Sequence, residues 1–168
     1  MTLDDLTVNF AHLKRDEILS DWEWLIGKDK LPILITAFGE AFLQDALDGS
    51  VHFLNVKNAS LSKVANTVDE LKLKLSDKEF ALEFLAVQAV SDLRKLGNFL
   101  SKGQVYSYKK APVLGGGVAP DNIEPTDIEV HFSLLGQIHE QVKSLPNGAS
   151  IRSIELNVQK KPWWKVWG

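Results

Sequence analysis

The chain has no cysteine and a single methionine, and none of its apolar runs is long. Without cysteine it contains no disulfide, no thiol nucleophile and no zinc–thiolate site. No window approaches the roughly 20 apolar residues that span a bilayer. Residues 1–17 carry acidic side chains and no apolar core, so they do not resemble a secretory signal. These absences predict a cytoplasmic protein without a membrane segment.

Positive charge is also scarce, because 22 acidic residues outnumber 19 basic ones and give a net charge of −3. Such a balance provides no general attraction to nucleic acids or anionic membranes. The charges are unevenly distributed: residues 94–110 contain five basic and no acidic residues, whereas residues 111–148 contain five acidic residues and one lysine. We therefore expect a dipolar surface, which matters more for the choice of a partner than for the fold.

Three short apolar segments at the front of the chain predict strands: Leu31–Phe38, Ala41–Gln44 and Val51–Val56. The Asp48-Gly49 pair between the last two favours a tight turn, because glycine readily adopts positive φ. Strands joined by such short connections predict an antiparallel meander. The expected fold class is α+β, with an antiparallel sheet over residues 31–56, extended by later strands and packed by two or three helices.

Helices are predicted before and after this meander in the sequence. Apolar residues recur at helical spacing between residues 16 and 26, and capping-box patterns begin at Thr67, Ser76 and Thr126. The segment 77–96 has the broadest apolar face, which predicts the main core helix. The expected single domain, residues 1–168, begins with an N-terminal helix over 1–27, a sheet over 31–66 with a strand at 61–65, and helices over 67–97. An irregular region over 98–125 with a strand at 104–108, a helix over 126–145, and a C-terminal strand and tryptophan tail over 149–168 should follow.

The tail contains three tryptophans within the last six residues. Large exposed apolar patches are rare on monomeric proteins. We therefore expect Trp163 and Trp164 to dock on the body of the protein, with Pro162 setting the bend. The alternative is that the tail forms an interface between two copies of the chain.

Signatures of catalysis and of cofactor binding are absent. The four histidines, His12, His52, His131 and His139, are scattered, and no HExxH, GxSxG or phosphate-loop pattern occurs. The glycines of Leu114–Gly117 lack the lysine and the following helix that phosphate binding needs. We expect structural roles for all four histidines, and neither a metal nor an organic cofactor.

Several motifs spread over the chain resemble a bacterial family of immunity proteins. That family (Tdi-type) is paired with DNase effectors of type VI secretion, and its domain is associated with GAD-like domains. The matching motifs are structural glycines, turns and aromatic residues. They are Trp24-Leu-Ile-Gly27 with Leu31-Pro32, Ala37–Phe42, Val51–Leu54, Leu114-Gly-Gly116 with Asn122, His131–Gln137, Gln141, Pro146-Asn-Gly148 and Pro162-Trp-Trp164.

The resemblance implies a non-catalytic binding protein that neutralises a nuclease toxin by direct contact, as a monomer or weak homodimer. Two alternatives stay open: a small hydrolase or nucleotide-binding enzyme that uses the 112–124 loop, and a structural or regulatory homodimer. An acidic surface can imitate the phosphates that a nuclease binds, and it accelerates association with a basic partner. The expected partner-binding residues are Asp121, Glu124, Asp127 and Glu129.

Overall fold

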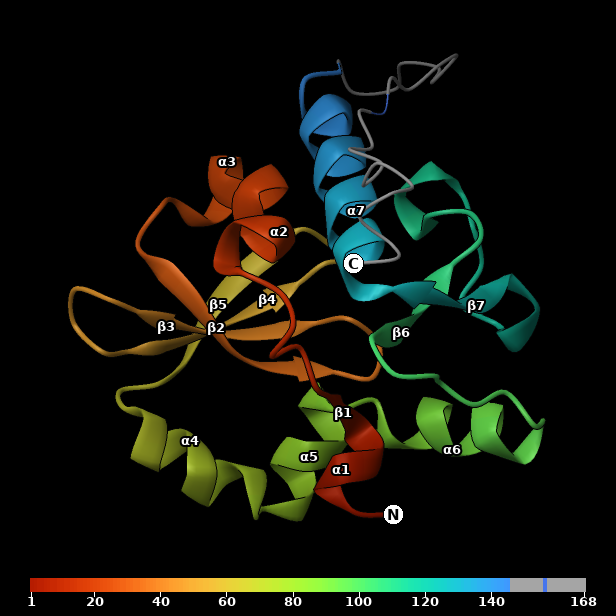
Figure 1. The fold of residues 1–168 in the computed structure, drawn as a ribbon, viewed down its shortest axis with the longest axis horizontal. Helices are drawn as coiled ribbons and strands as arrows, with labels where there is room; N and C mark the ends of the chain where they lie inside the picture. Colours follow the sequence, from red (N-terminus) through yellow and green to blue (C-terminus); the bar gives the residue numbers. More distant parts are fainter. Residues whose placement is uncertain (146–155, 157–168) are drawn as a thin grey trace.

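An antiparallel sheet lies between two layers of helices in the computed structural model, which describes residues 1–145 and Leu156 (Figure 1). Its five strands follow one another in space in the order of the sequence. The predicted meander and the α+β class are therefore confirmed. The strands are β1 (Thr7–Val8), β2 (Lys30–Thr36), β3 (Ala41–Asp45), β4 (Val51–Asn55) and β5 (Ser60–Ala65).

Alternate residues of the central strands enter two different hydrophobic clusters. Leu43 and Leu54 belong to the cluster on one face, whereas Phe42 and Phe53 belong to the cluster on the other. All four side chains are at most 7% exposed. Because successive side chains of a strand point to opposite faces, the sheet has apolar side chains on both sides and needs a layer of helices on each.

The upper layer in Figure 1 consists of α2 (Arg15–Leu19), α3 (Glu23–Ile26) and α7 (Ile128–Lys143). The single helix predicted over residues 16–26 is wrong, since a 3₁₀ turn, η1 (Ser20–Trp22), separates α2 from α3. This tighter turn places the Asp21 backbone against α7. A Cβ atom added to Gly136 would lie 2.6 Å from the Asp21 carbonyl oxygen, so a side chain at position 136 would push the two elements apart.

Helix α7 is the main core helix, instead of the segment 77–96 that the sequence pattern favours. Seven of its residues are buried, and the carbonyl of Phe132 accepts a hydrogen bond from the indole of Trp22 at 2.8 Å. The expected helix over 77–96 is broken into α5 (Lys78–Phe84) and α6 (Val87–Lys95) by Ala86, whose φ is +49°. Because of this break, Leu82 and Leu96 are left 46% and 68% exposed.

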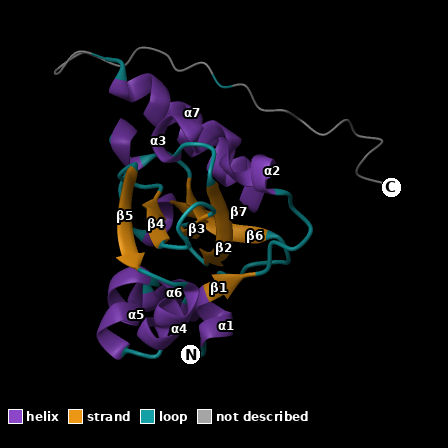
Figure 2. Ribbon diagram, turned by 90° about the vertical axis from the view of Figure 1, so that its left-hand side faces the viewer, coloured by secondary structure: helices purple, strands orange, loops and turns teal. Residues whose placement is uncertain are grey.

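The lower layer contains α1 (Leu3–Leu6), α4 (Val68–Leu75), α5 and α6, as the turned view in Figure 2 also shows. Phe80 and Phe84 of α5 pack on Phe42 and Phe53 of the sheet, with ring centroids 4.9–6.2 Å apart. Offset and edge-on contacts of this kind are the arrangements that aromatic rings favour. The short helix α5 is therefore anchored by two aromatic side chains.

One of the three predicted helix starts is correct. The Thr67 hydroxyl accepts the Glu70 N–H and begins α4. Asp77, not Ser76, caps α5, because its carboxylate accepts the Phe80 N–H at 2.9 Å. The N-cap position of α7 is Asp127, one residue after Thr126, and its side chain makes no capping hydrogen bond.

That strand, β7 (Ile123–Asp127), pairs with β6 (Gln104–Tyr108) in a second, two-stranded antiparallel sheet. The strand at 104–108 was expected, whereas β7 lies inside the region predicted to be irregular. Two short 3₁₀ turns, η2 (Pro112–Leu114) and η3 (Pro120–Asn122), shape the loop between these strands. Strand β1 was also not expected, since residues 1–27 were assigned to a helix.

The expected C-terminal strand and the docking of Trp163 and Trp164 concern residues 146–155 and 157–168, which lie outside the described part of the chain.

Candidate functional site

The acidic residues expected to bind a partner lie along β7 and its two ends. Asp121, Glu124 and Asp127 are exposed and form what we call the acidic edge. Glu124 and Asp127 stand about 10 Å apart on an extended segment and point to opposite faces of the strand. Glu129 is half-buried in the first turn of α7, and its Oε2 atom is buried without a hydrogen-bond partner among the described residues. The four carboxylates therefore line an edge and do not converge on one point.

The loop between β6 and β7 is fastened at its base by the side chain of Asn122. Its Oδ1 accepts the Lys110 N–H at 3.0 Å, and its Nδ2 donates to the carbonyls of Lys110 and Gly117 at 2.8 and 2.6 Å. A Cβ atom at Gly116 would collide with the Lys110 carbonyl oxygen, so the loop needs glycine there. Carbonyl oxygens and the Asn122 amide face its interior, and the loop therefore offers no cradle for a phosphate.

The same loop presents an apolar side chain next to the acidic edge. Val113 and Leu114 pack against the core, while Val118 is 63% exposed. A loop with an anchored base and an exposed tip presents its side chains with little loss of entropy on binding. Val118 is thus an exposed apolar side chain on the anchored loop that leads to the acidic edge.

A buried hydrogen-bonded network joins α7 to both sheets. His131, which is 1% exposed, donates its Nε2–H to the Gly39 carbonyl at 3.0 Å, because a carbonyl oxygen only accepts. Its Nδ1 then accepts from the Ser107 hydroxyl at 2.7 Å. Burial lowers the pKa of His131 to about 4, against the hydrogen bond to Gly39, which raises it.

Ser107 and His131 have the relative placement of a nucleophile and its general base, but their surroundings do not suit catalysis. Ser107 is only 7% exposed, and a base with a pKa near 4 accepts protons poorly at neutral pH. The pair instead satisfies its own buried polar atoms. The structural role expected for His131 matches these contacts.

Glu40 directly precedes β3 and follows Gly39 of the turn between β2 and β3. Its carboxylate accepts the Val56 N–H at 2.6 Å, and burial raises the pKa of Glu40 to about 8. Desolvation, together with the charge of Glu40, raises the pKa of Tyr108 to about 12. Sequence reasoning did not single out Glu40. The available signal was a lone acid between two apolar strands, in Ala37-Phe-Gly-Glu-Ala-Phe42.

The described residues contain no group of three or more His, Cys, Asp or Glu side chains that could hold a metal ion. Within the same part of the chain, no helix combines the length and apolar character needed to cross a bilayer.

The segment that contains the acidic edge matches a known family. Residues 65–139 fit the family described as T6SS immunity protein Tdi1, C-terminal. This match supports a T6SS immunity-protein family and covers residues 65–139 of the 168 in the chain. This Tdi1-type segment begins at the end of β5 and extends to His139 of α7, so it contains α4 to α6, the Asn122 loop and both strands of the second sheet. The resemblance stated from the sequence is thereby confirmed.

Among curated proteins, none matches the chain. Among solved structures, it is similar to the crystal structure of Atu4351 from Agrobacterium tumefaciens, with 18% identity and a TM-score of 0.49. The match covers 74% of this chain and 65% of that one.

Proposed function

We propose that this protein is a cytoplasmic immunity protein that binds a nuclease effector of type VI secretion and blocks its active site without catalysis. The observation that carries the proposal is the match of residues 65–139 to the Tdi1 immunity family. The expectation of a nuclease comes from the resemblance to immunity proteins paired with DNase effectors. The surface chemistry of the Tdi1-type segment is compatible with such a partner.

The acidic edge is the proposed contact surface. A nuclease binds DNA through cationic side chains directed at phosphates. Asp121, Glu124 and Asp127 are exposed carboxylates on a backbone fixed by the β6–β7 pairing and by Asn122. Such a surface attracts a cationic site over several ångströms and increases the rate of encounter. Glu129 supports this surface from a half-buried position in α7.

The test is the rate of association with the cognate effector. The double variant Asp121→Lys with Glu124→Lys should reduce that rate by about tenfold at low salt and by less at high salt, because ions screen exposed charges. Surface plasmon resonance at two ionic strengths measures both effects. Binding of the wild type should also abolish DNA cleavage by the effector.

A matched control reverses two other exposed acids, Glu79 and Glu83, which lie on α5 in the other helical layer. The variant with lysine at both positions has the same net charge as the test variant. It therefore distinguishes an effect of charge at the acidic edge from an effect of the net charge of the protein. Equal rates for the two variants would place the contact surface elsewhere. Absence of any binding by the wild type would reject the nuclease as partner.

A further inference from the structure

Strands β6 and β7 are joined by a long connection, residues 109–122, which is the Asn122 loop. Antiparallel neighbours need as few as two residues between them. The two ends of this loop meet, because Lys109 donates its N–H to the Asn122 carbonyl at 2.8 Å. Compact loops of about 6–16 residues whose ends lie close together are frequently functional. The whole loop belongs to the segment that matches the immunity family.

Both halves of the loop are held by hydrogen bonds. In the first half, the Ala111 carbonyl accepts the N–H of Gly116 at 3.1 Å. In the second half, Asn122 donates its backbone N–H to the Ala119 carbonyl at 3.0 Å and its side-chain amide to the Gly117 carbonyl at 2.6 Å. A loop that is already held in one conformation loses less entropy when a partner binds.

The tip of the loop consists of Val118, Ala119 and Pro120, which are all exposed. Val118 is 63% exposed and packs against neither hydrophobic cluster of the described residues. Single exposed apolar side chains are common on proteins. Here three uncharged, apolar residues follow one another on a hydrogen-bonded loop, and only a partner with a matching recess would remove Val118 from water.

Charged residues of both signs bracket this apolar tip along the chain. Asp121 directly follows it, whereas Lys109 and Lys110 stand at the base of the loop, and all three are exposed. An apolar centre with a polar rim is the usual arrangement of a protein–protein interface. Because the neighbouring charges are mixed, the tip would recognise a partner through shape and apolar contact.

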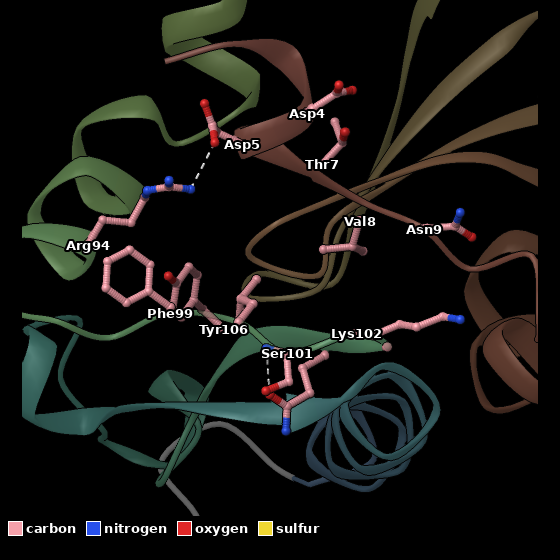
Figure 3. A pocket seen from close by; sticks show the side chains of 13 residues that line it. Asp4, Asp5, Thr7, Val8, Asn9, Arg94, Phe99, Ser101, Lys102 and Tyr106 are labelled. Atoms are coloured by element: carbon pink, nitrogen blue, oxygen red, sulfur yellow. Dashed lines mark hydrogen bonds and ion pairs between the residues drawn. The ribbon is translucent and has the colours of Figure 1, made fainter.

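A cleft of about 260 Å³ between β1 and the segment that leads into β6 offers a different kind of surface (Figure 3). Its lining includes Asp4 and Asp5 as well as Arg94 and Lys102, and Asp5 pairs with Arg94 at 2.9 Å. Such a lining favours neither an acidic nor a basic partner. The exposed Ser101 on its wall therefore provides a control position outside the Asn122 loop.

We propose that the tip of the Asn122 loop enters an apolar recess of the effector and that Val118 fills this recess. The inference rests on the immunity function proposed above and names the part of the protein that inserts. The acidic edge accelerates the encounter with the effector, whereas Val118 slows dissociation once the complex has formed.

The rate of dissociation from the purified cognate effector tests this role. Val118→Asn buries an amide without partners in the recess and leaves the net charge unchanged. The variant should dissociate about tenfold faster than the wild type, which corresponds to about 1.4 kcal/mol, and the effect should be equal at low and high salt. Val118→Ala keeps an apolar side chain and should have a smaller effect. Thermal melting checks that both variants are folded.

Two control variants change exposed positions elsewhere. Leu47→Asn alters a 79% exposed side chain in the turn between β3 and β4, outside the segment that matches the family. Ser101→Trp fills the cleft beside β1. Both should dissociate from the effector at the rate of the wild type.

The possible results separate this inference from the function on which it rests. If the wild type binds the effector and Val118→Asn dissociates at the same rate, the inserted tip is wrong and the immunity function stands. An equal acceleration by Leu47→Asn would also overturn the role of the tip. If the wild type does not bind the effector, both proposals fail. A wild-type dimer that separates in Val118→Asn would assign the tip to a second copy of this chain and overturn the inference.

Discussion

His131 lies 3.0 Å from the Gly39 carbonyl and fills the space that a side chain at position 39 would occupy. Gly39 has φ of +70° and ends the turn between β2 and β3. The two residues are 92 positions apart in the sequence, and their contact joins the sheet to α7. Both the backbone conformation and the contact require glycine at position 39.

Replacing Gly39 with alanine should therefore destabilise the protein by about 2–4 kcal/mol, as the sum of a collision with the His131 ring and a strained φ. Gly49→Ala isolates the cost of the strained φ, because Gly49 has φ of +76° and nothing lies within 4 Å of an added Cβ. It should cost only about 1 kcal/mol. Urea unfolding of both variants measures the difference. Equal losses would show that the His131 ring moves aside without cost.

His131 should also make stability depend on pH. Its folded-state pKa of about 4 is below the ordinary value of 6.5, so the unfolded chain binds the proton more readily between these values. The contribution of His131 to the free energy of unfolding should consequently fall by about 3 kcal/mol as the pH decreases from 6.5 to 4.

His131→Phe tests this dependence. The variant leaves the Gly39 carbonyl and the Ser107 hydroxyl without their partner, so it should be less stable at pH 7 by about 2–4 kcal/mol. The difference in free energy of unfolding between the variant and the wild type should become smaller as the pH falls to 4. Parallel pH profiles from denaturant unfolding would contradict this assignment.

Glu40 should have a pH dependence of opposite sign. Its folded-state pKa of about 8 is above the ordinary value of 4.5, so folding favours the protonated form, and stability is lost as the pH rises from 4.5 to 8. Because the residue is half-buried, water reduces this loss to about 1–3 kcal/mol.

Glu40→Gln retains an oxygen that can accept the Val56 N–H but carries no charge. We expect the variant to melt at a higher temperature than the wild type at pH 8.5, and to show a smaller difference at pH 5. Glu83→Gln, at an exposed position of α5, serves as the control. If the difference in melting temperature between the wild type and Glu40→Gln were the same at pH 5 and at pH 8.5, Glu40 would ionise at its ordinary pKa.

Asn122→Ala should loosen the loop between β6 and β7. The substitution removes three hydrogen bonds, to Lys110 and Gly117, so the Lys110 amide should exchange with deuterium about tenfold faster. The melting temperature should change little, because Val113 and Leu114 still pack against the core. Hydrogen-exchange mass spectrometry over residues 109–122 measures the effect. Asn58→Ala, at an exposed position near β5, should leave exchange in that loop unchanged.

Local sequence patterns determined the elements whose contacts are close along the chain. The meander from β2 to β4 could be predicted because each of these strands is a short apolar run and the connections between them are short. Thr67 was identified correctly as a helix cap, since its hydrogen bond is made with Glu70 only three residues away. The exposure of Asp121, Glu124 and Asp127 agrees with their charge alone, whereas partner binding at these residues stays a prediction.

Tertiary structure alone decided which helix forms the core and how the polar groups inside it are satisfied. The broad apolar pattern of 77–96 is interrupted by the left-handed Ala86, and α7 occupies the central position because Gly136 permits close approach to Asp21. His131 forms hydrogen bonds with Gly39 and Ser107, and Glu40 forms one with Val56. Each of these partners is distant in the sequence from the residue that it bonds. Desolvation by such distant segments shifts the two pKa values in opposite directions, and no local pattern records it.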